Sequence, residues 1–511
     1  MSTHKLIIKD AFWQILGRVI SALGGFLVVK LMTPYFGPLR YGDYSTILKY
    51  FAIWSAFADF GLYVIALRRL GELKDSLAPQ EDMEKYYGKF VMSRFTTITI
   101  VYTVALVLAY FIPAYTANPY LVRGLPLGMV FSASFMIAGI LQLPLQLYRW
   151  MKHVSIALTV ARIAQIITMV LVVTLYRNID FSNWDTRSVI SFILMIATVI
   201  VSAVVQWLYV WLVWNKHIKL KLVPDWGFTR RVIVENWQYG LAYCLSSLHT
   251  LWVMILLGIY FPTVDKFDYV GMRAVASALM EILLIVPSSL GNSIIHKVTS
   301  YSTEKMRAVF GSLLLFVVWI WGIFLINFSV FPAMIIRFVS GVSFLSSHTG
   351  WRWSDTILPW LAIVLFLSFI KQVYNFLFVA LHLNNRLLRV NGIGVLLWAI
   401  VGCILIPKYG IAWGIITQML MEFSYGLGGL YTAWKYKAPL IFSWKYMFGF
   451  LAGIVLFIRW GRVLVGTHAL SFRYCAALGV ILNAVILALS YKPLKVIMRW
   501  FNLPDATEAT T

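Results

Sequence analysis

The sequence predicts an all-α polytopic membrane protein with about 14 transmembrane helices. Three observations support this fold class. The 511 residues are 61% hydrophobic and only 12% charged, whereas a soluble domain carries about 25% charged residues. Apolar runs of about 20 residues, the length needed to cross the hydrocarbon layer, recur along the whole chain. The loops between these runs are short, and none has the length of an independent domain.

The predicted spans are separated by charged or turn-rich segments. The shortest, 392–406, can extend at its inner side through residues 389–391. The N-terminal segment leads into a full-length span without a small-residue cleavage site, so we expect it to be retained. In chain order the spans are 10–32, 44–67, 92–112, 124–148, 154–176, 189–214, 232–261, 268–295, 308–338, 357–381, 392–406, 411–434, 446–465 and 474–491.

Basic residues predict the orientation of the spans, because Lys and Arg stay on the cytoplasmic side of short loops. With the N-terminus inside, the inner segments hold about 26 basic residues and the outer loops about 8. Both termini are therefore predicted to be cytoplasmic. The net charge of +23 comes from these short loops and not from a soluble basic face, so the sequence argues against nucleic-acid binding.

A weak internal repeat suggests two similar halves. The dipeptide WQ opens spans 1 and 7 at 13–14 and 237–238, and DY opens spans 2 and 8 at 43–44 and 268–269. Two-lobed bundles with repeated halves are typical of secondary transporters, which bind their substrate between the lobes. We therefore expect two pseudo-repeated six-helix lobes plus two C-terminal helices. Their predicted ranges are 1–215, 216–434 and, for the last two spans and a cytoplasmic tail, 435–511.

Ionisable residues inside the spans are the first candidates for a functional site, because a charge in the hydrocarbon is costly unless it faces a cavity or a partner. Span 1 carries Gln14 and Arg18 on one helical stripe. Span 8 carries Arg273 and Glu281 on another, two turns apart. These positions predict a hydrated, mainly cationic cavity that receives an anionic substrate. The alternative is that the charges pair with one another or with backbone carbonyls and fix the helix packing.

Two further spans add to this set. Span 10 carries Lys371 and Asn375 one turn apart, and Asp59 lies in the inner half of span 2. Asp59 can instead pair with Arg68 or Arg69, or accept backbone hydrogen bonds. Lone charges such as Arg162, Arg337 and Glu422 are candidates for structural partners.

The sequence predicts neither a cofactor nor a metal. It contains no phosphate-binding glycine loop, nucleophile elbow or HExxH helix. His249 has no second His or Cys at metal-ligand spacing. The three cysteines fall singly inside apolar runs, where they are expected to be small buried hydrophobic residues. Since ATP-driven transport requires a soluble nucleotide-binding domain, any driving force must come from a gradient or the membrane potential.

The N-terminal third resembles the polysaccharide-transporter and O-antigen-flippase branch of the multidrug/oligosaccharidyl-lipid/polysaccharide (MOP) exporter superfamily. The resemblance rests on the opening run 10–25, on the turn 37–44 with the sequence GPLRYGDY, and on DFGL at 59–62 followed by Arg68 and Arg69. The span number and the six-plus-six-plus-two organisation are similar over the whole length.

This resemblance implies a V-shaped pair of lobes that flips lipid-linked oligosaccharides across the bacterial cytoplasmic membrane, and not an enzyme. Family members place cations in a central cavity, where they contact the diphosphate or acidic sugars. The expected partners are the lipid-linked substrate, the bilayer and other glycan-assembly membrane proteins. The expected substrate-binding residues are Arg18, Arg273, Lys371, Gln14 and Asn375, and the expected ion-coupling residues are Glu281 and Asp59.

Two other functions remain open. A cation-coupled drug exporter of the same fold is expected to have an acidic cavity, whereas Arg and Lys outnumber Asp and Glu within these spans. A polytopic glycosyltransferase or ligase that uses a lipid-phosphate donor needs acidic or His groups on a sizeable outer loop. The outer loops hold only scattered acids such as Asp43, Asp185 and Asp268.

Overall fold

The computed structural model is helical along the residues that it describes, which are 3–76, 79–148, 150–181, 185–215, 219–261, 268–298, 303–345, 353–381, 383–436, 440 and 444–467. The predicted all-α class is confirmed. The elements are α1 (Thr3–Asp59), α2 (Leu62–Asp75), α3 (Gln80–Tyr110), α4 (Pro113–Thr116), α5 (Pro119–Leu141), α6 (Leu143–Leu147), α7 (Met151–Leu175), α8 (Thr186–Trp214), α9 (Trp226–Glu235), α10 (Trp237–Tyr260), α11 (Asp268–Val298), α12 (Thr303–Val330), α13 (Pro332–Ser340), a 3-10 turn η1 (Val342–Phe344), α14 (Ser354–Ala380), α15 (Asn384–Tyr409), α16 (Ile411–Lys435) and α17 (Trp444–Thr467).

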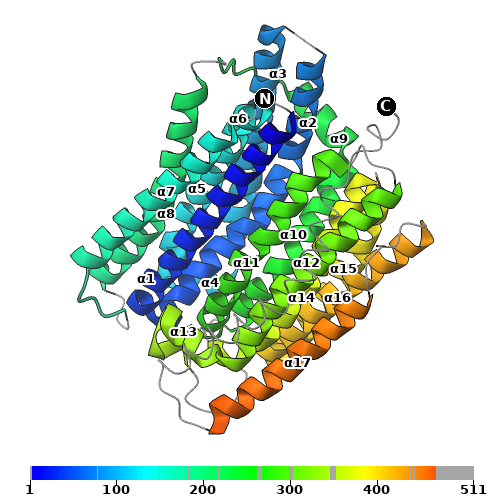
Figure 1. The fold of residues 1–511 in the computed structure, drawn as a ribbon. Coiled ribbons are helices and arrows are strands. Elements are labelled where there is room, and N and C mark those ends of the chain that lie inside the picture. Colours follow the sequence, from blue (N-terminus) through cyan, green and yellow to red (C-terminus); the bar gives the residue numbers. More distant parts are fainter. Residues whose placement is uncertain are drawn as a thin grey trace. The chain divides into compact units, whose positions relative to one another are not determined.

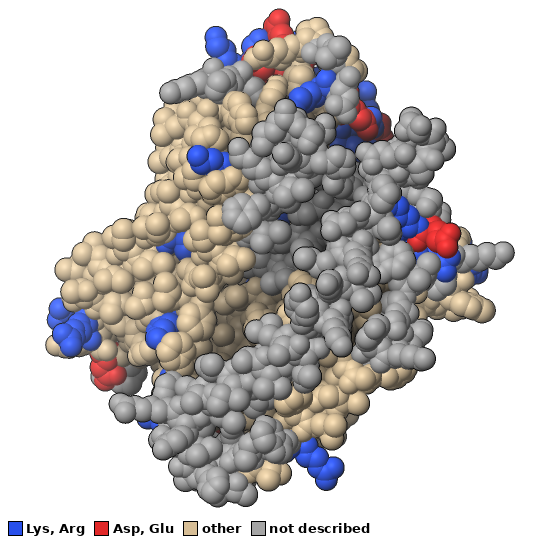
Figure 2. Space-filling view, in the orientation of Figure 1, with Lys and Arg blue, Asp and Glu red and all other residues tan. Residues whose placement is uncertain are grey.

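The described helices identify an integral membrane protein with several spans. Eight of these helical segments have the length and apolar composition needed to cross a bilayer. The short predicted span 392–406 lies within the 26-residue α15, so its extension through 389–391 is confirmed. The predicted span 474–491 lies outside the described residues. In the space-filling view, uncharged side chains form most of the described surface along α7 and α8, and charged side chains gather toward the ends (Figure 2).

Helix α1 consists of two arms that meet at Gly37, where φ is 65° and ψ is 177°. Only glycine adopts such a backbone conformation without strain. The first arm runs alongside α7 in the same direction, since the carbonyl of Trp13 accepts a hydrogen bond from Ser155 near the start of α7. Near the end of α7, the hydroxyl of Tyr35 donates to the carbonyl of Tyr176.

The second arm of α1 follows α5, which is connected through α6 to the start of α7. Ile47 contacts Gly124 near the start of α5, and Asp59 at the end of this arm pairs with Arg94, which lies near Gly139 toward the end of α5. The two arms therefore run antiparallel and correspond to predicted spans 1 and 2. Small residues allow this close packing, as is usual between membrane helices.

The chain divides into two compact units, Met1–Ala274 and Val275–Thr511. In the first unit, α1 packs against α3, α5, α7 and α10, and α8 packs against α5 and α7 (Figure 1). In the second unit, α14 packs against α12 and α16, α15 packs against α16, and α17 packs against α12. These units are defined by packing and do not test the predicted repeat, so the lobe boundaries at 215 and 434 stay a prediction.

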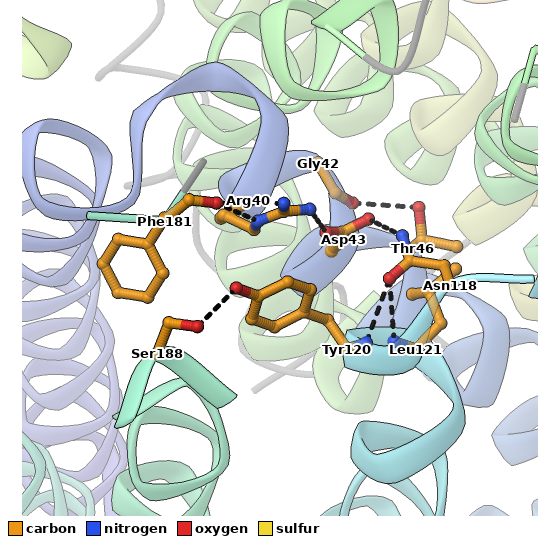
Figure 3. Close-up of polar contacts among 9 residues, drawn as sticks. All are labelled: Arg40, Gly42, Asp43, Thr46, Asn118, Tyr120, Leu121, Phe181 and Ser188. Atoms are coloured by element: carbon orange, nitrogen blue, oxygen red, sulfur yellow. Dashed lines mark hydrogen bonds and ion pairs between the residues drawn. The ribbon is translucent and has the colours of Figure 1, made fainter. Parts of the chain in front are cut away.

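A polar network connects the turn of α1 to neighbouring segments of the first unit (Figure 3). Arg40 is only 3% exposed. It donates to the carbonyl of Phe181 at 3.0 and 3.1 Å and to the carboxylate of Asp43 at 2.9 Å. Asn118 donates to the other oxygen of Asp43 at 2.8 Å and accepts from backbone N–H groups at the start of α5. The guanidinium of Arg40 also lies 4.0 Å from the centre of the Tyr120 ring.

At its other end, the first unit holds the segment that leads from α8 to α9 against the N-terminal part of α3. Lys89 Nζ lies 2.8 Å from Asp225 Oδ2, and Asp225 also accepts from the N–H of Phe228 in the first turn of α9. These bonds hold the pKa of the Asp225 carboxyl below its usual value, with the Lys89 bond as the larger cause. The backbone N–H of Lys219 donates to Glu84 at 3.0 Å.

Gly88 permits this contact, because a Cβ atom there would lie 1.7 Å from the carbonyl oxygen of Lys221. We expect Gly88→Ala to push residues 219–225 away from α3 and to lower the free energy of unfolding by about 1–3 kcal/mol. Thermal unfolding in detergent measures the loss, and limited proteolysis reports exposure of the segment.

Gly71 in α2 is the matched control, since its Cβ position meets nothing within 4 Å. Gly71→Ala is expected to raise the free energy of unfolding by up to about 1 kcal/mol through helix propensity. Equal changes in the free energy of unfolding for Gly88→Ala and Gly71→Ala would contradict the close contact between Gly88 and Lys221.

Candidate functional site

Polar side chains gather in the first unit at the end opposite the Gly37 turn. The Arg94 guanidinium lies 5.8 Å from the centre of the Tyr63 ring. Tyr63 forms a side-chain hydrogen bond with Gln146 and lies within electrostatic range of both Arg18 and Arg94. Arg94 on α3 therefore lies beside Tyr63 at the start of α2, with Arg18 on α1 within electrostatic range of the same side chain. We call Arg18, Asp59, Tyr63, Arg94 and Gln146 the arginine cluster.

Asp59 supplies the negative charge of the arginine cluster. Its Oδ1 atom lies 2.9 Å from Arg94 Nη2, and both side chains are less than a tenth exposed. The sequence-based pairing of Asp59 with Arg68 or Arg69 is wrong: these arginines contact Glu72 on their own helix, and Arg69 also contacts Glu235. The reason is the packing of α3 against α1, which places Arg94 beside Asp59.

The arginine cluster lies toward the membrane surface opposite the Gly37 turn. Arg18 precedes Gly37 by 19 residues, about 28 Å along a helix, and Arg94 precedes Tyr110 by 16 residues, about 24 Å. The hydrocarbon layer is about 30 Å thick. With the Gly37 turn at one surface, Arg94 therefore lies close to the opposite surface of the layer and Arg18 lies at its edge. Charges at this depth are costly unless they are paired or reach water.

The second unit contains a buried ion pair of its own. Lys371 Nζ on α14 lies 3.5 Å from Glu422 Oε2 on α16. The hydroxyl of Ser368 donates to Glu422 Oε1 at 2.6 Å, and the ammonium of Lys371 lies 5.0 Å from the centre of the Tyr425 ring. Lys371 is 7% exposed and Glu422 is 0% exposed. The predicted cavity lysine therefore has a carboxylate beside it.

The remaining predicted site residues lie in both units. Arg273 on α11 is only 1% exposed and follows Gly271, whose Cβ position lies 1.9 Å from the carbonyl oxygen of Pro38 in the reversal of α1. Glu281 on α11 and Asn375 on α14 belong to the second unit and are partly exposed. The side chains of Gln14 and His249 lie outside the described residues.

Sequence reasoning found the cations but missed most of their partners. Arg94 is not among the predicted site residues, yet it is buried beside Asp59. Of the lone charges in the spans, Glu422 lies against Lys371, and Arg162 donates to Gln165 at 2.6 Å. An acid in the middle of an apolar run is the signal that points to a buried cation elsewhere.

Solved structures define the class of protein to which this fold belongs. The structure of the lipid II flippase MurJ in an inward closed conformation matches 95% of this chain and 99% of its own, with a TM-score of 0.66 and 16% identity. The MATE multidrug transporter DinF-BH matches 86% of this chain and 96% of its own, with a TM-score of 0.59 and 14% identity.

An inward-facing MATE family transporter of the MOP superfamily matches 91% of this chain and 99% of its own, with a TM-score of 0.55 and 11% identity. The fold is therefore that of MOP-superfamily transporters. The sequence itself matches the polysaccharide biosynthesis protein family over residues 7–299, more than half of the chain, and the protein belongs to this family. No curated protein matches by sequence. The expected family is confirmed, and it is a family of transporters and not of enzymes.

Asp59 and Arg94 are expected to depend on each other for stability. Asp59→Asn or Arg94→Met alone leaves one buried charge without its partner and should lower the free energy of unfolding by about 3–5 kcal/mol. The double substitution should cost less than the sum of the two. Unfolding curves of the purified variants in detergent measure these values.

Arg68→Met is the control, because Arg68 and Glu72 are both more than half exposed. Breaking such a surface pair changes stability by less than about 1 kcal/mol. If the losses from Asp59→Asn and Arg94→Met simply add, the two side chains do not stabilise each other.

Proposed function

We propose that this protein is a flippase that moves a lipid-linked oligosaccharide, bearing a diphosphate, across the bacterial cytoplasmic membrane by alternating access. The observation that supports the proposal is that two arginines, Arg18 on α1 and Arg94 on α3, lie within electrostatic range of Tyr63. The family is one of polysaccharide biosynthesis, which favours a glycan substrate over a drug.

The physical task of such a flippase explains the need for fixed cations. A charged headgroup has to pass the hydrocarbon layer while the lipid tail stays in the bilayer. Arg18 replaces part of the water that a diphosphate loses, because a guanidinium group binds phosphate oxygens in a bidentate manner. Arg94 lies beside it and is already paired with Asp59. Closure of one end of the site before the other opens prevents leakage.

The finer architecture is part of this proposal. We propose 14 spans arranged as two pseudo-repeated six-helix lobes and two further helices, with both termini in the cytoplasm. Arg273, Lys371, Gln14 and Asn375 join Arg18 as substrate-binding residues. Glu281 or Asp59 couples the cycle to a proton or sodium gradient. Other glycan-assembly membrane proteins are the proposed partners.

A drug exporter of the same fold is the main alternative, since MATE structures share this fold. Its cationic substrates need acidic residues that are not already held by a cation, whereas the carboxylate of the arginine cluster, Asp59, is paired with Arg94. A lipid-phosphate-dependent glycosyltransferase finds less support, because the outer-side acid Asp43 is bound to Arg40 and Asn118 and is 0% exposed.

Binding of a polyprenyl diphosphate to the purified protein in nanodiscs tests the proposal. We expect binding of the diphosphate and no binding of the corresponding neutral polyprenol. Arg18→Ala should weaken diphosphate binding about 10- to 100-fold, since a hydrogen bond to a charged group contributes about 1.5–3 kcal/mol. Native mass spectrometry or a fluorescent-lipid titration measures the affinity.

Arg68→Ala is the matched control, because Arg68 is an exposed arginine on the neighbouring α2. It should leave binding unchanged. Export of surface glycan in a strain that depends on this protein is the cellular measurement, and Arg18→Ala should reduce it. Equal affinity for the diphosphate and the neutral lipid, or binding of a cationic dye in preference to both, would refute the flippase function.

A further inference from the structure

The second unit contains a buried carboxylate whose role is not explained by the substrate site. Glu422 lies near the middle of the 25-residue α16, so it is far from both membrane surfaces. One oxygen accepts the Ser368 hydroxyl at 2.6 Å, and the other faces Lys371 Nζ at 3.5 Å. A carboxylate at 0% exposure needs such partners, because burial of an isolated charge is very costly.

Few other described titratable groups of α14 and α15 lie near the Lys371–Glu422 pair, so one proton on Glu422 changes the net charge of the pair. Tyr425 lies beside Lys371 and donates its hydroxyl to the carbonyl of Asn391 on α15. On α14, the other titratable groups are Asp355 in the first turn and Tyr374, which packs on Gly429 of α16. On α15, the charged side chains are those of Arg386, Arg389 and Lys408, close to its two ends. Among the described contacts, Lys371 is a cation that lies directly against Glu422.

Two charge states of the pair differ in what Lys371 can bind. With Glu422 ionised, the pair is neutral and the ammonium is held by the carboxylate. When Glu422 takes up a proton, the carboxylate becomes a neutral acid that still contacts Ser368, and the ammonium keeps its three protons and its positive charge. Lysine carries this charge on a flexible stem, so its ammonium can turn to another anion.

We propose that Glu422 is a proton-binding site linked to anion binding at Lys371: the carboxylate of Glu422 and a substrate phosphate compete for the same ammonium. The proposal rests on the proposed function, in which Lys371 contacts the lipid diphosphate. Binding of the anion to Lys371 favours uptake of one proton by Glu422 from water, and release of the anion returns that proton. By reciprocity, lower pH strengthens binding of the anion.

The test measures affinity and proton uptake together. Polyprenyl diphosphate is titrated into the protein in nanodiscs by calorimetry in two buffers of different ionisation enthalpy. Wild type should take up about one proton more than Glu422→Gln on binding. The affinity of Glu422→Gln should be at least as high as that of wild type and should vary with pH only as far as the lipid phosphate itself titrates. Lys371→Met should weaken binding about tenfold or more.

Infrared titration of the protein without lipid examines the proton site independently. The carbonyl band of a protonated carboxylic acid should grow as pH falls, should be missing in Glu422→Gln, and should grow at higher pH in Lys371→Met, which removes the neighbouring cation. If this result holds while the diphosphate does not bind, the flippase proposal fails and the proton site stands. If the infrared band is the same in wild type and Glu422→Gln, the proton site is refuted.

Two control variants distinguish the proposed effect from a loss of folding. Lys371→Met/Glu422→Gln removes both charges and leaves no uncompensated group, so it should fold, bind the diphosphate weakly and take up no additional proton. Glu304→Gln changes an exposed glutamate in the same unit and should behave as wild type. Equal proton uptake by wild type and the double variant would overturn the link between Glu422 and Lys371.

Discussion

A charge inside the hydrocarbon layer needs an opposite charge or water within reach, and both units of this protein meet this constraint with a carboxylate. Asp59 lies against Arg94 in the first unit, and Glu422 lies against Lys371 in the second. Each pair joins two helices, so the electrostatic requirement also fixes helix packing. Removal of either partner leaves a charge that the surrounding apolar side chains cannot solvate.

The helices were predictable because the bilayer sets their length, and even the short span 392–406 proved to be part of a complete helix. The cations Arg18 and Lys371 were also predictable, since any ionisable residue in an apolar run stands out. Their surroundings were not. Tyr63 and Gln146 are ordinary residues in the sequence, and only the packing of α1, α2 and α3 brings Tyr63 close to Arg18 and Arg94.

Arg40 lies in the predicted turn 37–44 between two spans and is nevertheless buried. Its guanidinium is held by Phe181, Asp43 and Tyr120 (Figure 3). Sequence position gives the depth of a residue along the membrane normal but not its distance from the bundle axis. The match to the polysaccharide biosynthesis family ends at residue 299, so the pair Lys371–Glu422 has to be judged on its own geometry.

The attachment of residues 219–225 to α3 makes this segment part of the first unit. Lys219 and Asp225 are bonded to Glu84 and Lys89, and Gly88 gives the backbone room to approach. The distance between a spectroscopic label on α9 and another on the N-terminal part of α3 should therefore stay constant. Distances from these two labels to labels in the second unit would then report movements between the units. They would not include any separate motion of residues 219–225.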